Sequence, residues 1–161
     1  MMGASDPGMA AGGAVLRVAP MTLADLDEVL AVENLSFTTP WSRQSFYYEL
    51  TENPRALYLV VREDGNLAGY IGMWIVFDEG HITNLAVHPG HRRRGVATLL
   101  LDALTAAAKE RGVTRLTLEV RRSNVAAQLL YARYGFVCSG VRRRYYRDNN
   151  EDALIMWKAP I

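Results

Sequence analysis

One stretch constrains the fold of this chain more than any other, HPGHRRRGVATLLLDALTAAAKERG, from His88 to Gly112. An apolar run, HITNLAV, precedes it, so the order is strand, arginine-rich loop, helix. Apolar residues recur at helical spacing through this stretch, at Val96, Leu99, Leu100, Ala103, Leu104 and Ala107. They predict a helix over 96–111, with Gly112 as its stop. A helix with one apolar face that follows a strand must pack on a sheet, which places the chain in the α/β class.

The three arginines stand where a helix already carries a partial positive charge, so cations alone are unfavourable there. The placement makes sense if an anion binds, because the first amides of a helix have no internal partner and point outward. Neither GxxxxGK[ST] nor GxGxxG is present, so the phosphate loops that those motifs mark are absent. The pattern is R-x-x-G-x-A, from Arg92 to Ala97. A nucleic-acid contact and a solvated loop remain open at this point.

The other elements follow from turn residues and apolar periodicity. The expected order is β α α β β β α β α β β, with strands at 15–19, 56–62, 67–77, 81–87, 115–120, 136–144 and 152–158 and helices at 22–37, 43–50, 96–111 and 124–135. Helices and strands alternate only in the second half, so the sheet should be mixed. Without a linker or repeat, residues 15–161 read as one domain, preceded by a disordered tail at 1–14.

Composition fits a globular protein of a reducing compartment. Of 161 residues, 50% are apolar, 22% are charged and one is a cysteine, Cys138, which we expect to be a buried packing residue. No run of about 18 apolar residues predicts a membrane span. The first residues lack the basic and apolar segments of a signal peptide. We therefore expect a cytoplasmic protein.

The net charge of +1 conceals an asymmetry along the chain. Residues 1–90 hold 4 Lys and Arg against 11 Asp and Glu, whereas residues 91–161 hold 14 against 6. Such a chain can present one acidic and one basic surface. Alternatively, the halves interleave in the fold and their charges mix.

Two stretches, NLAVHPGHRRRGVATLLL and LEVRRSNVAAQLLYARYGF, closely resemble the GNAT superfamily of acyl-CoA-dependent N-acetyltransferases. Its signature, Q/R-x-x-G-x-G/A, is filled by Arg92, Gly95 and Ala97. The resemblance implies a single-domain GNAT acyl-CoA N-acyltransferase fold, with a mixed, mostly antiparallel central sheet flanked by helices. LEVR, SN.AA..LY...GF and RR.YY....EDA.IM further resemble the bacterial ribosomal-protein-alanine N-acetyltransferases. That likeness implies acetyl transfer from acetyl-CoA to the N-terminal alanine of a small-subunit ribosomal protein.

The resemblance also implies the coenzyme A site. Its pyrophosphate would be held by the loop and first helical turn, at Arg92, Arg93, Arg94, Gly95, Val96, Ala97 and Thr98. Its pantetheine arm would pair with the strand backbone at Leu85, Ala86 and Val87. Asn124 would contact coenzyme A as well, although it is equally a good N-cap for the helix that follows it.

Glu119 is the candidate general base. Leu116, Leu118 and Val120 face one side of the strand, so Glu119 faces the other, and we expect partial burial to raise its pKa. Without the resemblance, a rim carboxylate paired with an arginine would explain it equally well. The LEVR match implies a catalytic glutamate.

Tyr131 is the candidate general acid for the departing thiolate. Its pattern alone fits an aromatic residue packed on the sheet, and the LY...GF match implies the acid. Tyr134 does not fit the motif position. Trp41, Tyr145 and Tyr146 are candidates for gripping the peptide end, or for packing. Acidic residues of the first half could attract a basic ribosomal tail.

His81, His88 and His91 lack the spacing of metal ligands, so we expect no metal. Acyl transfer to other protein N-termini, to lysines or to a small amine remains an alternative. Two hypotheses from other functional classes are a non-catalytic acyl-CoA-binding module and an RNA-binding protein. Glu119 and Tyr131 together argue against the first of these. The second lacks a recognised RNA-binding signature with stacking aromatics.

Overall fold

The computed structural model describes residues 8–9 and 15–161, and from residue 15 on its elements follow the predicted order. The strands are β1 (Gly8–Met9), β2 (Val15–Pro20), β3 (Ala56–Glu63), β4 (Asn66–Val76), β5 (Glu79–Val87), β6 (Arg115–Arg121), β7 (Val137–Tyr146) and β8 (Glu151–Lys158). The helices are α1 (Leu26–Ser36), α2 (Arg43–Thr51), α3 (Val96–Glu110) and α4 (Val125–Arg133), with short 3-10 turns at Leu23–Asp25 and Pro89–His91. None of the helices in the described part is long and apolar enough to cross a membrane.

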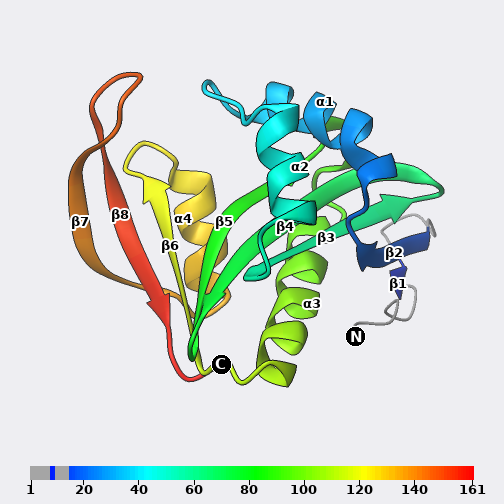
Figure 1. Cartoon of the computed structure of the whole chain (residues 1–161). Coiled ribbons are helices and arrows are strands. Elements are labelled where there is room, and N and C mark those ends of the chain that lie inside the picture. Colours follow the sequence, from blue (N-terminus) through cyan, green and yellow to red (C-terminus); the bar gives the residue numbers. More distant parts are fainter. Residues whose placement is uncertain (1–7, 10–14) are drawn as a thin grey trace.

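The strands form one sheet in the order β1-β2-β3-β4-β5-β6-β8-β7. Its pairs are antiparallel except β5 with β6, so the expected mixed and mostly antiparallel sheet is confirmed. The parallel pair is short and joins only 79–81 of β5 to 115–117 of β6. Beyond that segment the two strands diverge (Figure 1). The sheet is therefore split along part of its length.

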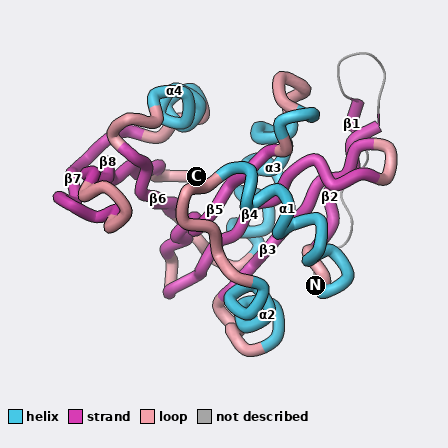
Figure 2. Tube along the Cα trace, turned by 90° about the horizontal axis from the view of Figure 1, so that it is seen from above, coloured by secondary structure: helices cyan, strands magenta, loops and turns pink. Residues whose placement is uncertain are grey.

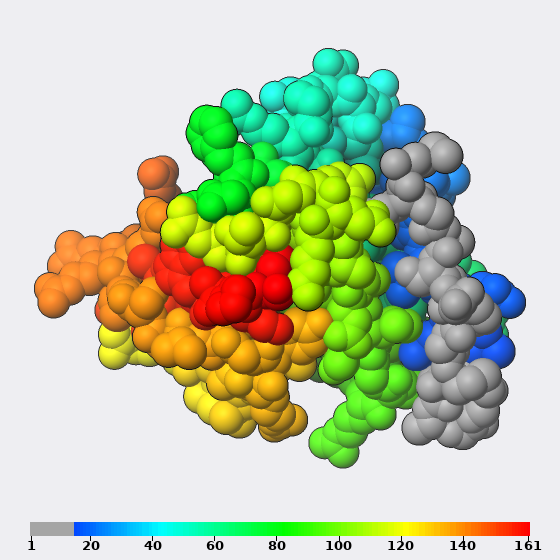
Figure 3. All heavy atoms as spheres, turned by 90° about the horizontal axis from the view of Figure 1, so that it is seen from below, coloured from blue at the N-terminus to red at the C-terminus, as the bar shows by residue number. Residues whose placement is uncertain are grey.

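Helices cover both faces of the sheet (Figure 2). On one face, α1 and α2 bury Leu26, Val29 and Phe46 against Tyr58 and Tyr70. On the other, α3 and α4 pack on a larger apolar cluster. Seen from below, the C-terminal residues in red lie between α3 in yellow-green and the α4–β7 segment in orange (Figure 3).

Short-range hydrogen bonds and turns set the ends of the helices. The backbone N–H of Thr22 donates to Asp25 Oδ2 at 2.8 Å, as in a capping box. Ser42 caps α2, where its Oγ accepts from the N–H of Ser45 at 3.1 Å. Gly112, with φ of +80°, follows α3 in the left-handed conformation that glycine adopts without strain.

The tail, Cys138 and the end of β7 differ from expectation or fall outside it. The expected disordered tail lies outside the described residues except for Gly8 and Met9, which pair with β2. Cys138 was expected to be buried, but it is exposed on β7, because the outer strand of the sheet has little packed against it. The predicted polar loop after residue 144 begins later, since β7 continues through Tyr146.

Candidate active site

A cavity of about 510 Å³ occupies the place where β5 and β6 part. Its walls come from the α1–α2 connection, β5, β6, α4 and the end of β7. Residues far apart in sequence, such as Trp41, Glu119 and Tyr131, line this one space. The divergence of the strands thus opens a passage between the two faces of the sheet.

Glu119 reaches the cavity from β6, on the face away from Leu116 and Leu118, as the alternation predicts. Its side chain is 10% exposed. Oε2 lies 2.5 Å from Nε2 of His81 on β5, and Oε1 lies 3.4 Å from Nε of Arg142 on β7. His81 in turn meets Trp74 edge to face, with ring centroids 6.1 Å apart. The carboxylate is therefore fixed between a histidine and an arginine.

The expectation that burial raises the pKa of Glu119 is wrong in its outcome. Burial is the largest single influence, and it does act to raise the pKa. The hydrogen bond and charge of His81, together with the charge of Arg142, outweigh it and hold the pKa below the ordinary glutamate value. The side chain is consequently ionised at neutral pH and able to accept a proton.

Tyr131 lines the same cavity from α4, on the other face of the sheet. It is 8% exposed and packs edge to face on Phe136, with centroids 5.6 Å apart. Burial, assisted by Tyr146, raises its pKa, so the phenol keeps its proton and remains a donor. Tyr134 instead bonds Asp102 at 2.5 Å and does not line the cavity.

The arginine loop has the form that its sequence suggests. Gly95, with φ of +77°, is the residue before α3, so the loop turns sharply into the helix. Glu63 on β3 engages His91 at 2.8 Å and Arg94 at 3.4 Å. Among the described residues, no carboxylate pairs with Arg92 or Arg93 within 4.0 Å. These two guanidinium groups are thus available to an external anion beside the free amides of α3.

The strand proposed for pantetheine has an open edge. Leu85, Ala86 and Val87 pair with β4 on one side, whereas pairing to β6 ends at His81. Asn124 caps α4, where its Oδ1 accepts from the N–H of Ala127 at 3.1 Å, and it also lines the cavity. Its expected capping role is confirmed, and a contact with coenzyme A remains a prediction.

The α1–α2 connection forms one wall of the cavity and is held by a buried carboxylate. Glu33 of α1 is 2% exposed. Its Oε2 accepts from the backbone N–H of Trp41 at 2.8 Å, and its Oε1 accepts from the Tyr70 hydroxyl. The Trp41 ring packs on Phe46, with centroids 5.4 Å apart. Trp41 therefore both packs and faces the cavity, so the two sequence interpretations are compatible.

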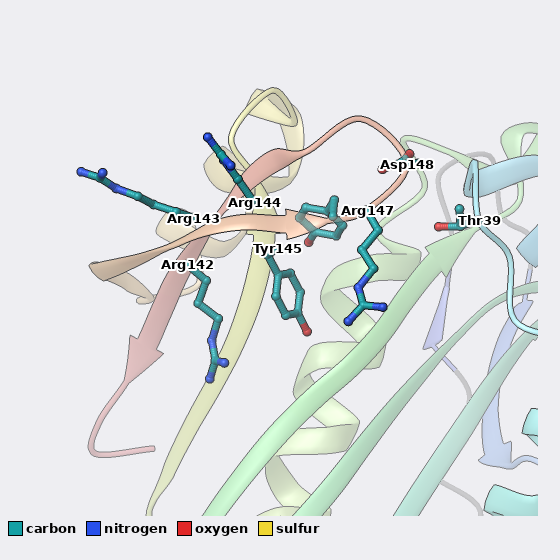
Figure 4. A pocket seen from close by; sticks show the side chains of 8 residues that line it. Thr39, Arg142, Arg143, Arg144, Tyr145, Arg147 and Asp148 are labelled. Carbon is teal, nitrogen blue, oxygen red and sulfur yellow. The ribbon is translucent and has the colours of Figure 1, made fainter.

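The opposite wall is the basic end of β7. Tyr145 and Tyr146 line the cavity, and Tyr146 lies under the guanidinium of Arg121 at 4.0 Å. An adjoining hollow of about 760 Å³ runs from Thr39 to the β7–β8 turn. Arg142, Tyr145 and Arg147 point to the same side of the strand, while Arg143 and Arg144 point away (Figure 4). A basic wall does not favour the hypothesis of an acidic site that attracts a basic tail.

Comparison with known proteins agrees with this geometry. The family model described as the acetyltransferase (GNAT) family matches residues 26–136. The chain belongs to the GNAT acetyltransferase family. Two relatives extend the match over nearly their whole length, and a solved structure shares the fold.

One relative of this GNAT acetyltransferase, from Escherichia coli (strain K12), is named ribosomal protein bS18-alanine N-acetyltransferase and is 35% identical over 86% of this chain and 94% of its own. A Bacillus subtilis (strain 168) protein, to which the same activity is assigned provisionally, is 50% identical over 85% of this chain and 91% of its own. The crystal structure of the ribosomal-protein-S18-alanine N-acetyltransferase from Escherichia coli superposes with a TM-score of 0.82 at 34% identity, over 90% of this chain and 94% of that one. The predicted single-domain GNAT fold is thereby confirmed.

Sequence patterns do not single out three residues that line this acetyltransferase's cavity, Glu33, His81 and Asn84, or Arg142, which pairs with Glu119. Glu33 is a carboxylate at a core-facing helical position beside Val29 and Val32. A charged residue on the apolar face of a helix is the pattern that could have indicated a buried, functional carboxylate. The sequence marks His81 only as part of a predicted strand, without the spacing of a metal ligand. In the described part of the chain, no three His, Cys, Asp or Glu side chains gather as metal ligands.

Proposed function

We propose that this chain transfers the acetyl group of acetyl-CoA to the N-terminal alanine of ribosomal protein bS18. The observation that carries the proposal is one cavity, open through the sheet, with an ionised carboxylate on one face and a protonated phenol on the other. Relatives with this activity in their names match more than nine-tenths of their own length, which supports the substrate. A ribosomal protein substrate implies that this enzyme acts in the cytoplasm.

Acetyl-CoA would bind along the open edge of β5 and at the start of α3. Its pantetheine arm would pair with the backbone of Leu85, Ala86 and Val87. Its pyrophosphate would meet the loop and first helical turn, Arg92, Arg93, Arg94, Gly95, Val96, Ala97 and Thr98, with Asn124 as a further contact. Arg92 and Arg93 support this: no carboxylate of the described residues pairs with them, and cations placed beside free helix amides are best explained by a bound anion.

Glu119 would act as the general base. The amine nitrogen attacks the thioester carbonyl carbon, a C–N bond forms, and the nitrogen becomes positively charged. An amine in that state is far more acidic than the free ammonium ion, so a carboxylate of lowered pKa suffices to take its proton. The attacking amine must first be neutral. An α-amine has a pKa of about 7.7–8.0 against about 10.4 for lysine, which lowers the cost by roughly 3.5 kcal/mol.

Tyr131 would act as the general acid. As the tetrahedral intermediate collapses, the C–S bond breaks and the sulfur carries the electron pair away. The buried phenol supplies a proton to that sulfur and recovers it later from solvent. Its raised pKa keeps it protonated until the thiolate develops. Trp41 on one wall and Tyr145 and Tyr146 on the opposite wall would hold the peptide end between them.

Intact-mass spectrometry with acetyl-CoA and two peptides tests the substrate. One begins with free alanine followed by the bS18 sequence. The other has the same residues, a blocked N-terminus and an added lysine. We expect one added acetyl group on the first peptide alone. Modification of the second alone would identify a lysine acetyltransferase. If neither is modified while coenzyme A binds, the substrate assignment is wrong.

A further inference from the structure

Asn84 lines the cavity with an amide nitrogen that lacks a hydrogen-bond partner among the described residues. The residue is 8% exposed, and the nitrogen is its Nδ2. Buried amide groups are normally paired, because an unpaired donor has lost its bonds to water without replacement. Asn84 lines the active-site cavity, so an incoming molecule can supply the missing acceptor.

Its orientation is set by a chain of hydroxyl groups. Thr83 Oγ1 donates to Asn84 Oδ1 at 2.7 Å, and it lies 3.1 Å from the Tyr58 hydroxyl. Tyr58 is itself buried in the α1–α2 cluster. Because Thr83 occupies Asn84 Oδ1, the atom of the amide that lacks a partner is Nδ2. The missing partner is therefore a hydrogen-bond acceptor.

The register of β5 puts Asn84 on the peptide side of the sheet. A bulge places Thr83 as an extra residue, since Ile82 faces Met73 and Asn84 faces Gly72. Ile82 and Leu85 consequently pack toward α3, while Ala86 belongs to the α1–α2 cluster. Asn84, two residues before Ala86, shares that second face. Ser36, the last residue of α1, also lines the cavity with an unpartnered hydroxyl.

A peptide N-terminus suits this placement. Glu119 is hydrogen-bonded to His81 of β5, and Asn84 stands three residues further along the same strand and lines the same cavity. In a peptide N-terminus, the amine and the carbonyl oxygen belong to one residue and lie roughly 3 Å apart. A residue whose amine meets Glu119 therefore presents its own carbonyl oxygen to this wall, where Asn84 Nδ2 is a donor without a partner among the described residues.

We infer that Asn84 binds the carbonyl oxygen of the substrate's first residue and so selects α-amines over lysine ε-amines. The inference rests on the proposed acetylation of a protein N-terminus. A lysine ε-amine has only methylene groups near it, so a lysine in the site would leave Nδ2 unpaired. Sites built to bond a polar group reject analogues that lack it.

The test compares two alanine-initiated peptides that differ at the first amide. One has the ordinary amide, and the other has a trans-alkene of the same shape without the carbonyl oxygen. We expect wild-type enzyme to show kcat/KM about 10- to 100-fold higher for the amide peptide. Asn84→Leu should lose most of that ratio by slowing the amide peptide alone. Equal rates on both peptides with wild-type enzyme would overturn the inference.

Two further variants keep the result interpretable. Asn84→Asp retains an acceptor for Thr83 but offers no donor, so it should also lose the ratio, even if Asn84→Leu folds poorly. Thr105→Val removes a buried hydroxyl on α3, outside the cavity lining, and should keep the ratio. If an Asn84 variant slows both peptides equally, its role is structural and the inference fails. No turnover of the amide peptide by wild-type enzyme would instead count against the proposed function.

Discussion

At the scale of single residues, the site combines groups that different elements hold in different states. His81 and Arg142 keep Glu119 ionised, whereas burial keeps Tyr131 protonated. The two side chains approach the cavity from opposite faces of the sheet. In the proposed reaction, the carboxylate would take a proton from the amine and the phenol would give one to the sulfur, without neutralising each other.

Glu33 should make stability depend on pH in a direction unusual for a carboxylate. Burial, the largest influence, raises its pKa above 4.5. The folded state then binds more protons than the unfolded state as pH rises from about 4.5, so this contribution to the free energy of unfolding falls, by about 1.4 kcal/mol for each pH unit in the window. Urea denaturation of wild type and Glu33→Gln between pH 4.5 and 8 measures the difference.

The variant cannot ionise, so the stability difference between wild type and Glu33→Gln should shrink as pH rises and then level off. A difference that is flat or grows with pH would contradict the buried position of this carboxylate. Glu52→Gln removes a carboxylate at the exposed end of α2 and serves as the control.

At the scale of elements, the decisive feature is the contact of β4 with the bulge in β5. Gly72 of β4 lies opposite Tyr58 on one side and Asn84 on the other. The Tyr58 ring crosses Gly72 so closely that an added Cβ would lie 2.1 Å from Cε1. A glycine at this position thus makes room for the ring whose hydroxyl reaches Thr83.

Gly72→Ala should therefore destabilise the protein by about 1–3 kcal/mol, because a buried and bonded ring must move. Gly140→Ala is the matched control, since its Cβ would lie at an ordinary 3.6 Å from Ile155 Cδ1, and it should change stability by less than about 0.5 kcal/mol. Chemical denaturation of both variants checks this. An equal free energy of unfolding for the two variants would contradict this, because it would mean that the Tyr58 ring can move aside without cost.

The elements themselves were largely predictable from sequence. Apolar periodicity and Gly112 located the ends of α2, α3 and α4 within two residues, whereas α1 begins four residues later than predicted, after a 3-10 turn. The alternation in RLTLEV placed Glu119 on the correct face. The bulge at Thr83 and the parting of β5 from β6 were not predictable, because both depend on pairing between distant segments. The His81–Glu119 contact escaped prediction for the same reason, and with it the sign of the Glu119 pKa shift.

At the scale of the whole molecule, the two charge-biased halves of the chain partly interleave. Arg94 and Arg115 of the basic half bond Glu63 and Glu79 of the acidic half. The β7–β8 hairpin remains basic beside the cavity, as Figure 4 shows for Arg142 and Arg147. The basic hairpin and the passage both belong to one sheet, which has an apolar cluster on each face.

The kcat/KM of Glu119→Gln on an alanine-initiated peptide tests most directly whether chemistry occurs across this passage. The substitution preserves shape and removes the proton acceptor. We expect kcat/KM to fall by about 10²–10⁴-fold, with coenzyme A affinity and the unfolding midpoint close to wild type. The kcat/KM of Tyr131→Phe in the same assay should also fall, because the variant lacks the proton donor. Turnover of Glu119→Gln within about threefold of wild type would contradict Glu119 as the base and the assignment of this cavity as the site of proton transfer.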